Sequence, residues 1–101
     1  MSEIIKTDNQ ATIKPGQDVV ASMANDFKAE LQSLIHESVE ELIIDLDGVE
    51  MVDSVGIGVM IATHNTLLKT GGVIKIVNVA EDIFNLFSTM RLDRHFAIEK
   101  K

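Results

Sequence analysis

The chain has 101 residues, and 16 acidic against 9 basic side chains give it a formal net charge of −7. This length predicts one domain over residues 1–101, because compact domains cluster at about 100–150 residues. The absence of cysteine excludes a disulfide framework and a cysteine-ligated zinc site. An acidic chain without an apolar run of about 18 residues is expected to bind neither nucleic acid nor membrane, which predicts a small soluble cytoplasmic protein.

The charge is unevenly placed along the chain. Residues 1–53 hold 12 acids and 3 bases, a net charge of −9, whereas residues 54–101 hold 4 acids and 6 bases, a net charge of +2. From Glu37 to Asp53 there are 7 acids and no base. Two interpretations stay open: a solvated acidic surface that aids solubility, and a patch that steers a basic partner.

The first elements are two short strands and a helix. Strands are expected over residues 2–7 and 11–14, around a turn at residues 8–10. Apolar residues at spacings of three and four then predict a helix of about five turns. They are Val20, Met23, Ala24, Phe27, Leu31, Leu34 and Ile35. Asp18 and Ser22 are alternative N-caps, because either side chain can accept a hydrogen bond from a free backbone N–H.

Strands and helices alternate in the rest of the chain. A β-branched apolar run at 42–46 predicts a buried strand, and Asp53-Ser54 signals a helix that ends at Gly71-Gly72. Residues 73–79 and 95–99 are strand-like, and Asn78 with Glu81 resembles a capping box for a helix between them. The expected buried face of that helix is Ile83, Phe84, Leu86, Phe87 and Met90.

The order β-β-α-β-α-β-α-β predicts an α/β fold. Strands that alternate with helices imply a mostly parallel central sheet with helices packed against it. The two N-terminal strands, joined by a short turn, add an antiparallel element.

The segment from Asp53 to Gly58 is the main candidate for a functional site. Ligand sites in open α/β sheets collect beyond the carboxyl ends of strands, and a helix N-terminus offers free N–H groups and a partial positive charge. Gly56 and Gly58 let a backbone or a ligand approach closely. Three interpretations of Ser54 compete: an ordinary helix start with packing glycines, a phosphate-binding loop, and a serine nucleophile.

The sequence favours the first of these on physical grounds. The two glycines lack the third glycine of a dinucleotide loop, and no Walker lysine follows. Ser54 is not in a G-x-S-x-G elbow. His64 would lie about 15 Å further along the same helix, which is too far to act as a base.

We interpret the remaining polar and sulfur-containing side chains as structural and not as parts of a functional site. The three histidines form no zinc-binding pair, and His64 is expected to be a half-exposed helix residue. Asp45 and Asp47 lack a third acid or a phosphate loop, so solvation is favoured over a magnesium pair. Three methionines are expected to fill gaps in the core, with an adaptable contact surface as the alternative, namely Met51, Met60 and Met90.

Three segments together resemble the STAS domain family, and more narrowly the bacterial anti-sigma factor antagonists. They are the strand at 42–46, the run Val52-Asp53-Ser54-Val55-Gly56-Ile57-Gly58-Val59, and Gly71-Gly72 before a strand. The usual family pattern is an apolar strand followed by Asp-Ser-(Ser/Thr)-Gly-(Leu/Ile)-Gly. Leu92-Asp93-Arg94-His95-Phe96 resembles the end of the family's sequences. The resemblance runs from about Ile4 to Ile98 and implies a single STAS-like domain over residues 1–101.

The resemblance implies a regulatory switch that is not an enzyme and needs no cofactor. In this family a partner serine kinase, a histidine-kinase-like ATPase that is also the anti-sigma factor, phosphorylates the serine that follows the aspartate. The unphosphorylated antagonist binds that kinase, and a metal-dependent serine phosphatase restores binding. By position, Ser54 is the phosphoacceptor. The implied partner-binding residues are Asp18, Ser22, Asp53, Val55, Gly56, Ile57 and Gly58.

The sequence departs from the family pattern in three places. Val55 stands where many members have Ser or Thr, and Arg91 stands where glycine is common. Val20 and Met23 fall near the positions of an Asp-x-x-Thr element, which points to a partner that differs from a typical anti-sigma kinase. The alternative function is a structural or adaptor subunit of a signalling scaffold or transporter that uses the same face without phosphorylation. An enzyme that binds a phosphorylated ligand ranks third, for lack of an acid–base pair.

Overall fold

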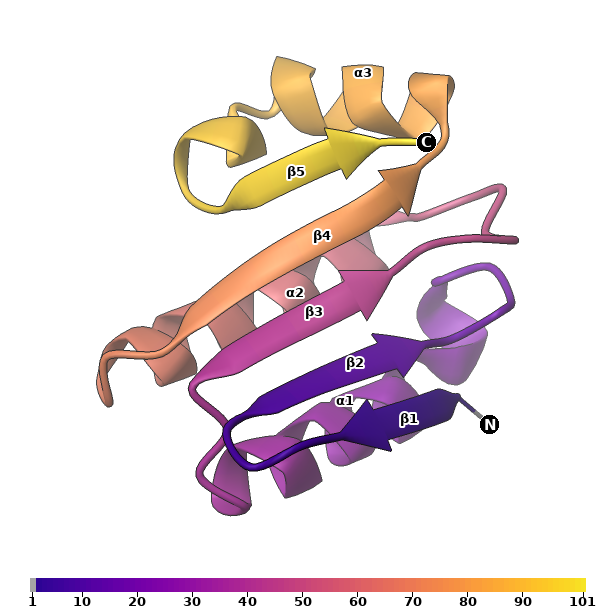
Figure 1. Ribbon diagram of the computed structural model, residues 1–101. Helices are drawn as coiled ribbons and strands as arrows, with labels where there is room; N and C mark the ends of the chain where they lie inside the picture. The colour runs from indigo at the N-terminus through magenta and orange to yellow at the C-terminus, as the bar shows by residue number, and fades with distance from the viewer. Residues whose placement is uncertain (1) are drawn as a thin grey trace.

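The structure, a computed structural model, describes residues 2–101 and consists of one sheet with helices packed against it (Figure 1). Within these residues the element order confirms the predicted α/β fold and adds one short 3-10 turn, η1. The elements are β1 (Glu3–Lys6), β2 (Gln10–Lys14), α1 (Ala21–His36), β3 (Glu41–Asp45), α2 (Ser54–Leu68), β4 (Val73–Val79), α3 (Glu81–Thr89), η1 (Leu92–Arg94) and β5 (Ala97–Lys100).

The sheet has five strands in the order β1-β2-β3-β4-β5. β1 pairs antiparallel with β2, and every later neighbour is parallel. The mostly parallel sheet with an antiparallel element near the N-terminus is therefore confirmed, and the sheet as a whole is mixed. Each helix returns the chain to the start of the next strand, which places consecutive strands side by side.

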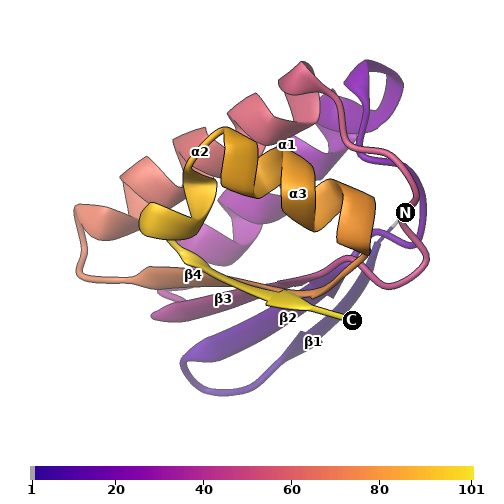
Figure 2. The same cartoon turned by 90° about the horizontal axis from the view of Figure 1, so that it is seen from above.

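All three α-helices lie on the same face of the sheet, as the view from above shows (Figure 2). The central strands therefore alternate between a buried and a half-buried side, and the core forms between the helices and one face of the sheet. Its largest fully buried side chains include Phe27, Leu31, Leu42, Ile44, Met60, Leu67, Ile76 and Phe87. Burying one such side chain contributes about 1.5–3 kcal/mol. None of the helices in residues 2–101 is long and apolar enough to cross a membrane.

The start of α1 differs from both sequence expectations. Neither Asp18 nor Ser22 caps the helix; Val20 occupies the N-cap position without a side-chain hydrogen bond. The Asp18 carboxylate instead accepts hydrogen bonds from the backbone N–H groups of Glu50 and Met51, at 3.0 and 3.1 Å. These partners lie 32 and 33 residues away in the chain. A local pattern cannot reveal such a contact.

The start of α3 also differs from the prediction, because Asn78 is not part of a capping box. Asn78 has a left-handed backbone (φ 56°), and Ala80 is the N-cap. The Asn78 side-chain amide donates to Asp45 at 2.9 Å and so joins the ends of β4 and β3.

The buried face of α3 is narrower than expected. Only Ile83 and Phe87 are buried, whereas Leu86 and Met90 are exposed. The expected core position of Met51 is also wrong, because its side chain is 58% exposed in the loop before α2. The α3 helix has only 9 residues, and Phe84, which is partly buried, packs against the core beside the buried Ile83 and Phe87.

Candidate functional site

Two loops that lie far apart in sequence run side by side at the carboxyl end of the sheet. The N–H of Val19 donates to the carbonyl of Met51 at 2.9 Å, and the N–H of Asp53 donates to the carbonyl of Val19 at 3.2 Å. Val19 and Val52 form a parallel bridge. These contacts bring the first residues of α1 and α2 to the same place.

Asp53 caps both helices with one carboxylate. Its Oδ1 accepts from the N–H of Gly56 at 2.9 Å, and its Oδ2 accepts from the N–H of Ala21 at 3.0 Å. The Gly56 N–H and then the Ala21 N–H lower the pKa of Asp53, because both hydrogen bonds favour the charged form. Asp53 is therefore ionised at neutral pH and fixes the start of α1 relative to that of α2.

Ser54 is the first residue of α2, and its side chain is exposed. The cap position belongs to Asp53, so the Ser54 hydroxyl is not needed to begin the helix. None of the three histidines lies near it along the described chain. His36 ends α1, His64 lies ten residues along α2, and His95 follows η1. The placement of these elements gives no support to a serine nucleophile with a histidine base.

The two glycines after Ser54 differ in what surrounds them. A Cβ on Gly56 would lie 2.3 Å from the carbonyl oxygen of Val19, so only glycine lets the two loops approach this closely. A Cβ on Gly58 would meet nothing within 4 Å. The ordinary interpretation, a helix cap with packing glycines, thus accounts for Asp53 and Gly56 and leaves Ser54 and Gly58 without a structural role.

The acidic stretch from Glu37 to Asp53 does not form one surface. Glu37, Glu40 and Glu41 lie where α1 ends and β3 begins, at the opposite end of β3 from the start of α2. Glu50 and Asp53 belong to the loop before Ser54, where Asp18 joins them from the first loop. The negative region beside Ser54 therefore comes from two chain segments and is smaller than the sequence indicates.

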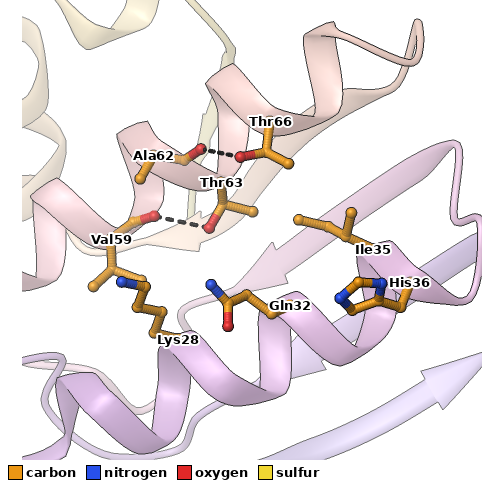
Figure 3. A pocket seen from close by; sticks show the side chains of 8 residues that line it. All are labelled: Lys28, Gln32, Ile35, His36, Val59, Ala62, Thr63 and Thr66. Atoms are coloured by element: carbon orange, nitrogen blue, oxygen red, sulfur yellow. Dashed lines mark hydrogen bonds between the residues drawn. The ribbon is translucent and has the colours of Figure 1, made fainter.

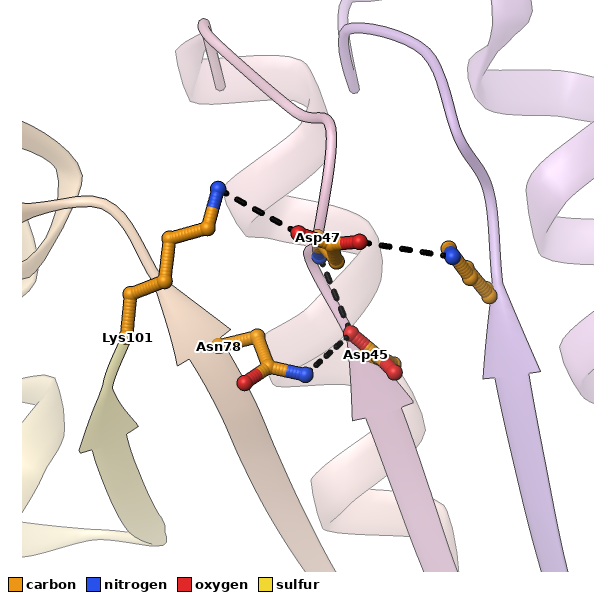
Figure 4. A network of polar contacts seen from close by, with 5 residues as sticks. Asp45, Asp47, Asn78 and Lys101 are labelled. Carbon is orange, nitrogen blue, oxygen red and sulfur yellow. Dashed lines mark hydrogen bonds and ion pairs between the residues drawn. The ribbon is translucent and has the colours of Figure 1, made fainter.

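Asp45 and Asp47 are held in a network at the ends of the strands (Figure 4). Asp47 pairs with Lys14 at 3.4 Å and with Lys101 at 3.2 Å, and these two lysines lower its pKa, with Lys101 the larger cause. Asp45 accepts from the Asn78 amide and from the N–H of Asp47, both at 2.9 Å. Among residues 2–101, no three acidic or histidine side chains form a group that could hold a metal ion.

A groove of about 260 Å³ separates α1 from α2 (Figure 3). Its lining residues are Lys28, Gln32, Ile35, His36, Val59, Ala62, Thr63 and Thr66. The two threonine hydroxyls donate to carbonyls of their own helix, at 2.8 and 3.0 Å. The polar side chains left to meet a ligand therefore come from α1, where Lys28, Gln32 and His36 recur every four residues. This face of α1 was not predicted from the sequence, although the four-residue spacing of its polar side chains could have indicated it.

His64 is more deeply buried than the sequence predicted. Its side chain is only 8% exposed rather than half-exposed, and Phe96 packs edge-on against the ring with centroids 5.1 Å apart. Burial, together with the charge of His95, lowers the pKa of His64. Its environment depends on η1 and the start of β5, which no pattern local to α2 can indicate.

Comparison with known families places this geometry in a protein class. The family model of the STAS domain matches residues 2–101, so the chain belongs to the STAS domain family. The resemblance inferred from the segment around Ser54 is thereby confirmed at the level of the family.

Solved structures share the fold at low sequence identity. A protein of Thermotoga maritima assigned as an anti-sigma factor antagonist matches with a TM-score of 0.92 and 21% identity, over 99% of this chain and 86% of that one. The Bacillus cell fate determinant SpoIIAA in its phosphorylated form matches with a TM-score of 0.77 and 15% identity, over 97% and 90% of the two chains. The murine anion transporter solute carrier 26 family member A9 matches at 0.78 and 17% identity, over 96% of this chain and 17% of that one.

Proposed function

We propose that the protein is a cytoplasmic regulatory protein of the anti-sigma factor antagonist type, and that phosphorylation of Ser54 switches its binding off. Its partner in this proposal is a serine kinase, a histidine-kinase-like ATPase that also acts as an anti-sigma factor. A metal-dependent serine phosphatase reverses the modification. The observation that carries the proposal is the exposed hydroxyl of Ser54 at the start of α2, beside a carboxylate that already caps the helix.

Gly58 supports the same interpretation. Glycine inside a helix costs about 0.5–1 kcal/mol relative to alanine, yet nothing in the described structure occupies the space that an alanine methyl would fill. Gly58 lies one helical turn after Ser54 on the same exposed face. A partner that approaches the backbone of α2 at this point gives the glycine a role that the isolated domain does not.

The docking face is proposed around Ser54. Met51 and Val55 are large apolar side chains exposed by 58% and 46%, and they flank the serine in sequence. Asp18, Ser22 and Asp53 add polar groups from the two adjoining loops. Two of the expected partner-binding residues, Gly56 and Ile57, are buried. In the proposal these two residues pack beneath the docking face and do not contact the partner.

Electrostatic repulsion is the proposed basis of release. A phosphate group adds about −1.5 to −2 charges at pH 7. On Ser54 it would stand next to the ionised Asp53 and within four residues of Glu50. A partner surface that accommodates a neutral hydroxyl and the apolar side chains would then have to desolvate two adjacent negative groups.

The phosphorylation step is tested by intact-mass analysis after incubation with the candidate kinase and ATP. Wild type is expected to gain one phosphate, Ser54→Ala to gain none, and Ser33→Ala to behave like wild type. Ser33 is the control, because it is an exposed serine of α1 that lies outside the proposed docking face. Equal phosphate uptake by wild type and Ser54→Ala would overturn the assignment of Ser54.

The binding step is tested with three substitutions of Ser54 and an affinity measurement on the kinase. Ser54→Asp is expected to weaken binding, whereas Ser54→Asn, of similar size but uncharged, and Ser54→Ala should retain it. If Asp and Asn weaken binding equally, size rather than charge controls the interface, and the repulsion mechanism is wrong.

The alternative, a structural or adaptor subunit, is favoured by the likeness to a domain within an anion transporter. In that case the same face binds its partner whether or not Ser54 is modified. Val55→Asp should then abolish the complex, while the phosphorylated wild type keeps it. Loss of the complex on phosphorylation would contradict the adaptor function and support the phosphorylation switch.

A further inference from the structure

The outer side of β1 is an unpaired edge of the sheet. β1 comes first in the strand order and lies at one edge in Figure 1, so within residues 2–101 only β2 pairs with it. All of its residues are exposed, and the side chains of Ile4 and Ile5 are exposed by 43% and 70%. Proteins usually protect such an edge, because its free N–H and C=O groups can pair with a strand of another chain.

The pairing with β2 determines which backbone groups of β1 point outward. The N–H of Thr7 donates to the carbonyl of Gln10 at 2.8 Å, which makes these two residues a hydrogen-bonded pair in the β1–β2 register. Hydrogen-bonded and non-hydrogen-bonded pairs alternate along an antiparallel ladder. Ile5 is therefore bonded to β2, whereas the N–H and C=O groups of Ile4 and Lys6 point away from it.

The same edge carries charges of both signs. A hollow of about 470 Å³ lies between β1 and α1, and its lining includes Ile4 and Lys6 from the strand and Glu30 and Glu37 from the helix. Among residues 2–101, neither Lys6 nor these two glutamates takes part in an ion pair. The edge therefore offers acidic groups to a basic side chain and carries a basic side chain of its own. Two copies of this edge are complementary in charge.

We propose that β1 pairs antiparallel with β1 of a second copy of this chain, with Ile5 directly opposite Ile5 of that copy. A two-fold axis perpendicular to the sheet relates the two copies. The two sheets then join into one continuous sheet, with the helices of both copies on the same face. The contact lies away from Ser54 and does not depend on the function proposed for that residue.

Symmetry restricts the register of this pairing. Residues directly opposite each other face the same side of a sheet, so the axis must pass beside a residue that faces its own copy. An axis at Ile5 pairs Ile4 with Lys6 of the second copy, and the free groups of both residues then form about four hydrogen bonds across the axis. An axis at Ile4 would instead pair Lys6 with Ser2, whose N–H already donates to Glu30 at 3.2 Å.

Side chains on both faces of the sheet support an axis at Ile5. Side chains alternate along a strand, so Ile5 lies on the face opposite to Ile4 and Lys6, and it packs there against its own copy. On the helix side, Lys6 of the second copy lies next to Ile4 and can reach the hollow that contains Glu30 and Glu37. The contact is small, so a dissociation constant on the order of 0.1 mM is expected.

The first test is a charge exchange at Ile5, measured by sedimentation equilibrium of the full chain up to about 1 mM. Wild type should approach twice the monomer mass at the highest concentration. Ile5→Lys and Ile5→Glu should each dimerise about tenfold more weakly or worse, because like charges then lie directly opposite each other. An equimolar mixture of the two variants should regain the dimer, because opposite charges then meet. The exposure of Ile5 leaves the core of each variant unchanged.

The second test uses the absence of cysteine from the chain, which makes a single introduced thiol specific. Ile5→Cys should form a disulfide-linked dimer on mild oxidation, because Cβ atoms of directly opposite residues lie about 4.5–5.5 Å apart and a disulfide needs about 3.5–4.5 Å. Ile4→Cys is the matched control, since it lies one residue away on the other face. It should link much more slowly.

Four results would overturn the proposal. The first is a wild type that stays monomeric at about 1 mM, and the second is a dimer that Ile5→Lys does not weaken. The third is a mixture of Ile5→Lys and Ile5→Glu that is no more dimeric than either variant alone. The fourth is faster disulfide linkage of Ile4→Cys than of Ile5→Cys, because the axis would then not lie at Ile5.

Discussion

The polar groups at the two ends of α2 differ in their burial and in their hydrogen bonding. At the start, Asp53 uses both carboxylate oxygens for backbone N–H groups, and Ser54 is left exposed. Toward the end, His64 is buried, and its Nδ1 has no hydrogen-bond partner among residues 2–101. The first arrangement gives an ordered surface with one exposed hydroxyl group, and the second leaves a buried nitrogen unpaired in the described part of the chain. The two ends of one helix thus differ in how their polar groups are satisfied.

The largest effect is expected from Gly56→Ala, which acts on the first end. Its methyl group would lie 2.3 Å from the Val19 carbonyl oxygen and force the two loops apart. Such overpacking costs about 1–3 kcal/mol of the free energy of unfolding, measurable by urea denaturation. Gly58→Ala is the matched control and should stabilise by about 0.5–1 kcal/mol. Similar behaviour of the two variants would mean that the loops are not in close contact.

Asp53→Asn should cause the next largest loss of stability, because a weaker acceptor replaces the charge that caps two helices. The folded-state pKa of Asp53 is lowered, so its contribution is fully present above the unfolded value near 3.8. It is lost as the pH falls from there through the folded value. Denaturation curves of the variant should therefore show less acid sensitivity than wild type. Equal acid sensitivity would contradict the cap.

Arg91→Gly tests the C-terminal segment that covers His64. Arg91 has a left-handed backbone (φ 62°) directly after the α3 C-cap Met90, a position that glycine favours. Glycine at this position relieves a backbone strain of about 1–2 kcal/mol, and this gain is partly offset by the greater freedom of glycine in the unfolded chain. A net gain of up to about 1 kcal/mol is expected in chemical denaturation. Destabilisation would show that the arginine side chain has a structural contact of its own.

The smallest effect is a pH dependence at the second end of α2. The folded-state pKa of His64 is lowered, so its contribution is fully present above the unfolded value near 6.5 and decreases as the pH falls below that value. His95, Glu41 and Lys75 line the hollows beside the ring and share its environment.

The measurement is the free energy of unfolding at several pH values just below and above 6.5. His64→Phe should reduce the slope of the free energy of unfolding against pH relative to wild type. An unchanged slope in His64→Phe would mean that the ring titrates alike in the folded and unfolded states.

The sequence predicts what depends on near neighbours. The apolar stripe from Val20 to Ile35 predicts α1, and the β-branched run at 42–46 predicts β3, because periodicity reflects which side faces the core. Asp53 and Ser54 signal the start of α2 for the same local reason.

Contacts between distant segments could not be predicted in this way. Asp18 Oδ1 and Asp53 Oδ2 each accept a hydrogen bond from an N–H group 32 residues away, and the Asn78 side-chain amide donates to Asp45 on the neighbouring strand. The burial of His64 depends on η1 and Phe96, which follow it by about thirty residues. The STAS pattern locates Ser54 on the chain but gives no indication of the hollow between the later part of α2 and the C-terminal segment.

The bridge between Val19 and Val52 has a consequence for binding rates. Because the loops before α1 and α2 are already hydrogen-bonded to each other, a partner that docks at Ser54 meets an ordered surface and does not have to arrange it. Little conformational entropy is then lost on association, and association is limited by diffusion and orientation of the partner. A change at this face should therefore alter the lifetime of a complex more than the rate at which it forms.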